Sequence, residues 1–280
     1  MADELAARTL AGAEQTTERV RFDLEMLGGA FERRYRRLRP EVEGIPWGSL
    51  DTVGLADDIR RDAQARWTLF AFNEYRSSIA MAQVAQAAIA AQAPLDLVAF
   101  ASTFVTDELV HTELGARMAM ELGGAAEILF NPAELFVEVP PNQSPLRTAA
   151  ALVVRVCAVS EVVSSAIGRA LWHATTEPLA RAVLGRIMRD EFKHAALGAA
   201  FLDWSDDDLN AADRELLSVV AQAAVDLYRS GTGEPSDAEL PSHPANALTW
   251  FSSNACRSVR EAAIRDQVAG PLERRGIFVR

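Results

Sequence analysis

The feature that most constrains this chain is a five-residue pattern that occurs twice, as Asp107-Glu108-Leu-Val-His111 and as Asp190-Glu191-Phe-Lys-His194. Residues three apart lie on one face of a helix, so each copy would place a carboxylate beside an imidazole. The chain has four histidines, and two of them lie in this pattern. The repeat therefore predicts two helices that contribute to one metal site.

The rest of the sequence also favours an all-α fold. Alanine, leucine and arginine are abundant while glycine and proline are sparse, which favours helix. Helices are predicted over residues 56–91, 95–122, 145–174 and 178–203, after an N-terminal helix over about 1–40 and before extra helices over about 205–270. The acidic cluster at 205–208 is expected to start the first extra helix, and no paired strands are expected. We interpret residues 1–280 as a single domain with a four-helix core over about 56–203.

Two further glutamates, Glu74 and Glu161, lie in apolar surroundings on the first and third helices of this core. In an antiparallel helix pair, residues at the same height are equidistant from the connecting turn. Position 91, midway between Glu74 and Glu108, and position 176, midway between Glu161 and Glu191, both fall at predicted turns. Each glutamate would then lie roughly 20–25 Å from its turn, at about 1.5 Å per residue. The predicted metal ligands are Glu74, Glu108, His111, Glu161, Glu191 and His194.

With this set of ligands, residues 56–203 resemble the ferritin-like superfamily of dinuclear carboxylate proteins, and its oxidase and oxygenase branch more than its storage branch. The resemblance implies a ferritin-like antiparallel four-helix bundle with additional N- and C-terminal helices. It also implies that Glu108 and Glu191 bridge two metals as the catalytic carboxylates, with Glu74 and Glu161 as terminal ligands.

The same resemblance implies roles for residues next to the ligands. Asp107 would accept the ring N–H of His194, and Asp190 that of His111, fixing each ring. Ser165 stands where some di-iron monooxygenases carry a threonine implicated in handling dioxygen. Solvated acids and an ordinary small core residue are the alternatives. Six residues close to the ligands are predicted to line a pocket, with plain core packing as the alternative: Trp67, Phe70, Phe104, Cys157, Ala158 and Ile187.

By this resemblance the chain is expected to be a non-haem di-iron oxidoreductase, an oxidase or monooxygenase that activates dioxygen to hydroxylate, desaturate or N-oxygenate a small organic substrate. Gly115 and Ile187 depart from the patterns of tyrosyl-radical subunits and arylamine N-oxygenases, respectively. The cofactor would be two iron ions, Fe2+ or Fe3+, with manganese or a mixed Mn/Fe pair as the alternative. A reductase or ferredoxin would donate electrons. A ferroxidase or other iron-handling protein, and a metal-free helical protein, are the competing hypotheses.

Composition limits the partners and the compartment. A net charge of −11 argues against nucleic acid and anionic membranes as partners. The N-terminus lacks the features of a secretory signal, and no stretch approaches the roughly 20 apolar residues of a membrane span, so a cytoplasmic protein is expected. Two cysteines are too few for a disulfide framework. A monomer and a homodimer both remain open. One basic cluster is either a solvated helical face or a docking patch for an acidic redox partner: Arg33, Arg34, Arg36, Arg37 and Arg39.

Overall fold

The computed structural model describes residues 18–230 and 253–280, with side chains from 256 onward in the second range. These residues are mostly helical, as the sequence predicts. The longest helices are α3 (Asp57–Ala90), α4 (Leu95–Glu121) and α7 (Pro178–Trp204). Their bounds lie within one residue of the predicted ones.

A fourth long helix runs without a break from Pro145 to Ala174, as predicted, but it is not α-helical throughout. It consists of α5 (Pro145–Val153), the π-helical segment η3 (Val154–Ser160) and α6 (Glu161–Ala174). A π-helix has one more residue in each hydrogen-bonded ring than an α-helix, and such segments are frequent at functional sites. Nothing in the sequence pattern predicted this segment.

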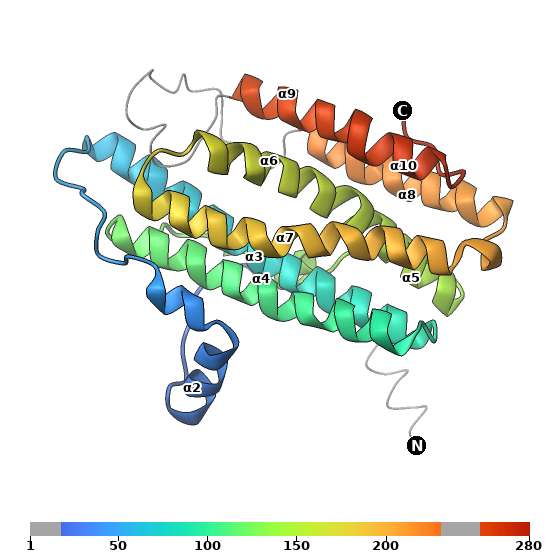
Figure 1. Ribbon diagram of the computed structural model, residues 1–280, viewed down its shortest axis with the longest axis horizontal. Helices are drawn as coiled ribbons and strands as arrows, with labels where there is room; N and C mark the ends of the chain where they lie inside the picture. Colours follow the sequence, from blue (N-terminus) through green and yellow to red (C-terminus); the bar gives the residue numbers. More distant parts are fainter. Residues whose placement is uncertain (1–17, 231–252) are drawn as a thin grey trace.

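The four long helices lie side by side, and each contacts two others (Figure 1). The most extensive contact joins α3 to α4; α4 also contacts α7, α7 contacts α6 and η3, and α5 returns to α3. Short connections at 91–94 and 175–177 reverse the chain between consecutive helices. This arrangement encloses one central space between the helices.

The apolar core inside this space is divided in two along the helix axes. One part contains Trp67, Leu114 and Leu184, and the other contains Val84, Phe104 and Phe201. On α3, α4 and α7, the predicted ligands Glu74, Glu108 and Glu191 lie between residues of the two parts. The boundary between the two cores is where the metal ligands are predicted.

The C-terminal elements cover one side of the four helices. They are α8 (Ala211–Arg229), α9 (Ser253–Ala263), the π-helical segment η6 (Ile264–Ala269) and α10 (Gly270–Glu273), and they pack on α5, η3 and α6. The prediction that residues 205–208 start α8 is wrong. Asp206–Asp208 forms a short 3-10 turn, η4, and Asn210 caps α8 in a reciprocal capping box with Asp213. The part of the predicted extra helices that falls on 231–252 lies outside the described residues.

The prediction of one N-terminal helix over 1–40 is also wrong for its described part. Gly28 and Gly29 have φ angles of 81° and 62°, in the left-handed region that interrupts a helix, so α2 spans only Gly29–Leu38. Before it, β1 (Val20–Arg21) pairs antiparallel with β2 (Leu129–Phe130), contrary to the expectation of no paired strands. Two short 3-10 helices complete the fold: η1 (Pro40–Gly44) and η2 (Pro132–Leu135).

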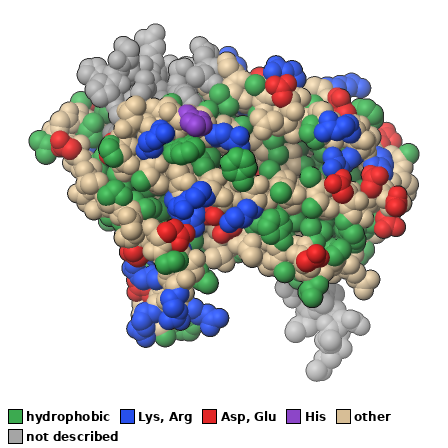
Figure 2. Space-filling model, in the orientation of Figure 1, with side chains coloured by type: hydrophobic (Ala, Val, Ile, Leu, Met, Phe, Trp, Pro, Cys, Tyr) green, Lys and Arg blue, Asp and Glu red, His purple; other side chains and the backbone are tan. Residues whose placement is uncertain are grey.

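The helix α2 projects away from the other helices and carries most of the basic cluster (Figures 1 and 2). Its arginines are not equivalent. Arg39, which follows α2, is buried and donates to Glu43 and, at 2.7 Å, to Glu113. Arg36 is paired with Glu32. The structure therefore divides the predicted cluster into arginines that hold the neighbouring segments together and arginines that face solvent.

The helix Pro145–Ala174 is the one helix of the described residues that is long and apolar enough to cross a membrane, with a mean hydropathy of 1.8 over its most apolar window. By length and composition it therefore qualifies, contrary to the expectation from the sequence. In the structure 61% of that window is buried against other parts of the protein, as in the core helix of a helical bundle.

Candidate metal centre

The six residues predicted as metal ligands converge at the boundary between the two apolar cores. They form two overlapping groups, and within each group one ligand atom per residue lies within 4.8 Å of the others. The first group is Glu74, Glu108, His111 and Glu191, and the second is Glu108, Glu161, Glu191 and His194. Only Glu74 keeps appreciable exposure, at 17% of its side chain. Glu108 and Glu191 belong to both groups, which gives the cluster two adjacent centres.

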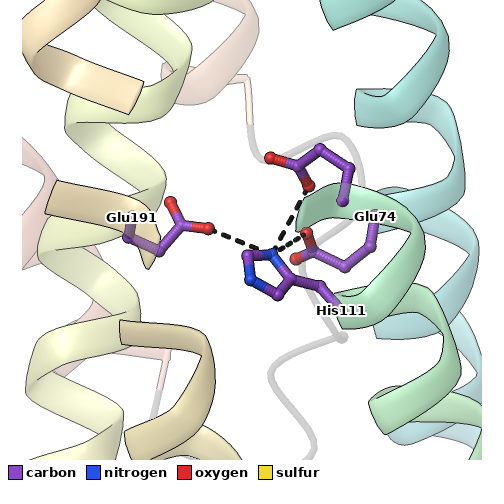
Figure 3. Close-up of side chains that lie close together, drawn as sticks. Glu74, His111 and Glu191 are labelled. Atoms are coloured by element: carbon purple, nitrogen blue, oxygen red, sulfur yellow. Dashed lines mark ion pairs between the residues drawn. The ribbon is translucent and has the colours of Figure 1, made fainter. Parts of the chain in front are cut away.

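Each centre is built around the Nδ1 atom of one histidine. The Nδ1 atom of His111 lies 3.5 Å from Glu74, 3.6 Å from Glu108 and 3.3 Å from Glu191. Figure 3 shows the His111 ring between Glu74 and Glu191, which reach it from helices on opposite sides. The Nδ1 atom of His194 lies 3.0 Å from Glu108 and 3.1 Å from Glu161. The two rings are thus turned toward the same group of carboxylates.

Several of these atoms are buried without a hydrogen-bond partner. In the described part of the chain, both carboxylate oxygens of Glu108 and the Nδ1 atom of His111 lack one. A buried polar atom without a partner is costly, and native proteins seldom leave one so. Coordination of a metal ion would satisfy all three atoms, so the residues present fit such an ion.

The pKa shifts of the clustered carboxyl groups also favour a bound metal ion. Burial, followed by the charges of Glu161 and Glu108, raises the pKa of Glu191 to about 8. Burial and the neighbouring Glu108 also raise the pKa of Glu74 well above its usual range. Burial acts on Glu108 too, but the adjacent imidazoles of His111 and His194 outweigh it and lower the pKa of this carboxyl. Four clustered carboxylates repel one another when all are charged, and two divalent cations would neutralise their four charges.

The far side of each imidazole ring faces an aspartate of the other repeat. The Nε2 atom of His111 lies 3.3 Å from Asp190, and the Nε2 atom of His194 lies 3.6 Å from Asp107. If each Nε2 carries the proton, each Nδ1 is free to bind a metal. The structure thus brings these pairs together, and their function in orienting the rings remains a prediction.

Ser165 and one of the predicted pocket residues adjoin a cavity of about 270 Å³ that reaches the cluster. The hydroxyl of Ser165 donates to Glu191 at 3.0 Å, and Ser165, Ala158 and Glu191 all line this cavity. The other predicted pocket residues do not line it: Trp67, Phe70, Phe104, Cys157 and Ile187.

Those five residues pack mainly against other side chains of the core. The ring of Phe104 packs 4.3 Å from that of His194, between centroids, and Trp67 packs edge-on against Phe70 at 5.6 Å. Cys157 is fully buried, and this burial raises the pKa of its thiol, which favours the protonated form over a thiolate ligand. Helical spacing alone brought these residues near the ligands but could not tell which face lines a cavity.

Of the other two histidines, only one lies in the described residues, and it stands apart from the cluster. His173 is exposed near the end of α6. His243 lies outside the described residues.

Sequence reasoning missed two glycines and an ion-pair chain. Gly115 and Gly198 each follow the histidine of a repeat by four residues, and a Cβ atom on either would come within 3.1 Å of the facing helix. The repeat thus extends to Asp-Glu-x-x-His-x-x-x-Gly, a signal that was present in the sequence. Arg186 bonds both Asp190 and, at 2.6 Å, Glu41 of η1, and no local pattern connects residues so far apart.

Comparison with known proteins does not assign a family. No family model matches the chain, no curated protein matches it, and no solved structure matches it. What can be said of its function therefore depends on the cluster itself.

Proposed function

We propose that the cluster holds two metal ions and that the protein is a di-iron oxidase or oxygenase with a ferritin-like four-helix bundle. The bundle would consist of α3, α4, α7 and the helix from Pro145 to Ala174. The observation that carries the proposal is the sharing of Glu108 and Glu191 between two groups of ligands, each completed by one further glutamate and one histidine. Two Glu-x-x-His pairs with one glutamate from each of two other helices are the ligand pattern of dinuclear carboxylate bundles.

Carboxylates and imidazoles suit iron and manganese better than they suit softer metals. Such a pair of ions, when bound, supplies the electrons that activate dioxygen for the oxidation of a small organic substrate. An external reductase or ferredoxin would restore those electrons after each cycle.

The protein's own residues would hold and shield this centre. Glu108 and Glu191 lie between the two histidines and would bridge the ions, while Glu74 and Glu161 would each bind one of them. The apolar cores on both sides exclude water from the cluster. Ser165 holds one oxygen of Glu191 by its hydrogen bond, on the side where the cavity opens. In the described part of the chain, this cavity and the partly exposed Glu74 offer a substrate two routes to the centre.

The first prediction tests the ligands directly. After anaerobic reconstitution with ferrous iron, we expect two irons per chain in the parent protein. Glu108→Ala and His194→Ala should each abolish this stoichiometric binding of two irons. Glu108 belongs to both groups of ligands, and the Nδ1 atom of His194 lies beside Glu108 and Glu161 in the second group. His173→Ala is the matched control, since His173 is an exposed histidine of the same protein and should leave the iron content unchanged.

Equal iron content in all three variants would rule out the site as drawn. The optical spectrum after adding dioxygen to the ferrous protein, together with size-exclusion chromatography, separates oxygenase from iron storage. Many irons per chain in a large cage would overturn the proposal in favour of storage.

A further inference from the structure

The cavity beside the cluster has two chemically different ends. It lies between α6, α7 and the C-terminal segment formed by η6 and α10. One end contains Glu191 and Ser165, which are buried, with the exposed Arg169 one helical turn beyond Ser165. The other end contains Leu202, which follows Glu191 by eleven residues or about 16 Å of helix, together with Arg275. Between these ends the lining is mainly aliphatic: Val162, Ala195, Val268 and Leu272.

The two arginines of the lining, one at each end, differ in what they already bind. Arg275 is paired with Asp203 at 2.5 Å and donates to the carbonyl of Pro271. The guanidinium of Arg169 lies 4.6 Å from the centre of the Phe192 ring, and it has no carboxylate within ion-pair distance among the described residues. Arg169 therefore has charge and donors free for an anion. Its contact with the Phe192 ring holds the Arg169 side chain at the cavity.

The volume of the cavity and the backbone around it further limit which ligands it can bind. A volume of about 270 Å³ corresponds to roughly nine water-sized groups. That is just below the range of drug-sized pockets. Both π-helical segments contribute to the lining, Ala158 from η3 and Gln267 from η6, and such segments are typical of functional sites.

We propose that this cavity binds a small amphipathic monoanion, an aliphatic carboxylate of about eight carbons. Its carboxylate would lie at Arg169, and its hydrocarbon chain would pass Glu191 and extend along the aliphatic lining toward Leu202. The inference rests on the proposed function and deepens it by placing the first carbons of the hydrocarbon chain beside the metal centre. Binding itself requires only the cavity, so it can be measured apart from any reaction.

The second prediction compares octanoate with octan-1-ol by isothermal titration calorimetry, on protein whose metal content is measured in parallel. Octanoate should bind once per chain and more tightly than octan-1-ol. Arg169→Gln should weaken octanoate about fivefold, as expected for one exposed ion pair, and change octan-1-ol by less than about twofold. Arg189→Gln is the matched control, because Arg189 is exposed on α7 but does not line the cavity, and it should change neither.

A second pair of variants tests the cavity itself. Ala199 lines the cavity at an exposed position, so Ala199→Phe should fill it and abolish binding of both ligands without disturbing the core. Ala196→Phe, at an exposed position of α7 outside the lining, should leave binding and the melting temperature unchanged.

The outcomes separate this inference from the proposed function. Absence of octanoate binding in protein that holds two irons overturns the inference and leaves the di-iron proposal standing. An equal effect of Arg169→Gln on both ligands overturns the orientation. Octanoate binding that responds to Arg169 and Ala199 in protein without two metal sites supports the cavity and overturns the di-iron proposal.

Discussion

The two halves of the cluster have nearly the same sequence but different surroundings. In the His111 half, Asp190 accepts hydrogen bonds from Arg186 and, at 3.1 Å, from Lys193, and Arg186 also donates to Glu41. In the His194 half, Asp107 is 19% exposed and has no other hydrogen bond or ion pair in the described part of the chain. A repeated motif has thus produced one braced aspartate and one that is nearly free.

The cause of this difference is local and can be read from the sequence. Four residues before Asp190 stands Arg186, and three residues after it stands Lys193, both within reach on a helix face. The corresponding positions around Asp107 are Thr103 and Val110, which offer no cation. The half without bracing is the one whose ligand Glu161 directly follows η3. We infer that one half holds its metal firmly while the other leaves room for changes in coordination.

The largest effect should come from removing the braced aspartate. Asp190→Asn is expected to weaken one of the two metal sites about 10- to 100-fold, because it removes the charged partner of His111. In the metal-free protein it should also lower the free energy of unfolding by about 3 kcal/mol, near the low end for a broken buried ion pair, since Arg186 keeps Glu41. Asp107→Asn should weaken metal binding less than about tenfold. Chelator competition and denaturant unfolding measure the two quantities.

Equal losses of affinity in Asp107→Asn and Asp190→Asn would remove the distinction between the halves. A larger loss in Asp107→Asn would reverse it.

The sequence was sufficient to predict the four long helices and the convergence of six side chains. The reason is that Glu74 and Glu108, like Glu161 and Glu191, are related by short turns, so spacing along the chain determines height in a helix pair. The pocket residues could not be predicted in the same way. Which face of a helix lines a cavity depends on the C-terminal elements that cover α6 and α7, and their placement follows from distant contacts.

Local backbone conformation could not be predicted from the sequence pattern either. The break at Gly28-Gly29 is visible as a pair of glycines, but the pattern does not tell that both adopt left-handed φ angles. The π-helical segment before Glu161 has an ordinary apolar sequence. In both places the tertiary structure decides between conformations that the sequence allows.

An intermediate effect should separate the two glycines that follow the repeats. A Cβ atom on Gly115 would lie 2.8 Å from the Phe70 ring and 3.0 Å from the backbone of α3, whereas on Gly198 the nearest atom would be at 3.1 Å. Overpacking costs about 1–3 kcal/mol, and alanine recovers up to about 1 kcal/mol of helix propensity. We therefore expect Gly115→Ala to lower the free energy of unfolding by about 2 kcal/mol, and Gly198→Ala by about 1 kcal/mol.

Gly168→Ala is the control for these two changes. Its Cβ atom would meet only the flexible end of Met188, so thermal unfolding should be nearly unchanged. A larger loss of unfolding free energy in Gly198→Ala than in Gly115→Ala would contradict this expectation. It would mean that the His194 half is the more tightly packed of the two.

The smallest effect should come from the outer end of the braced half. Glu41 is bonded to Arg186 at 2.6 Å but is 39% exposed, so Glu41→Gln should cost less than about 1 kcal/mol of stability. Its effect on metal affinity should pass through Asp190 and should therefore disappear in an Asp190→Asn background, which a double-mutant cycle measures. Glu43→Gln, also on η1 but bonded to Arg39, should leave metal affinity unchanged. A Glu41→Gln effect that persists without Asp190 would mean that η1 influences the centre by packing, not through the chain of charges.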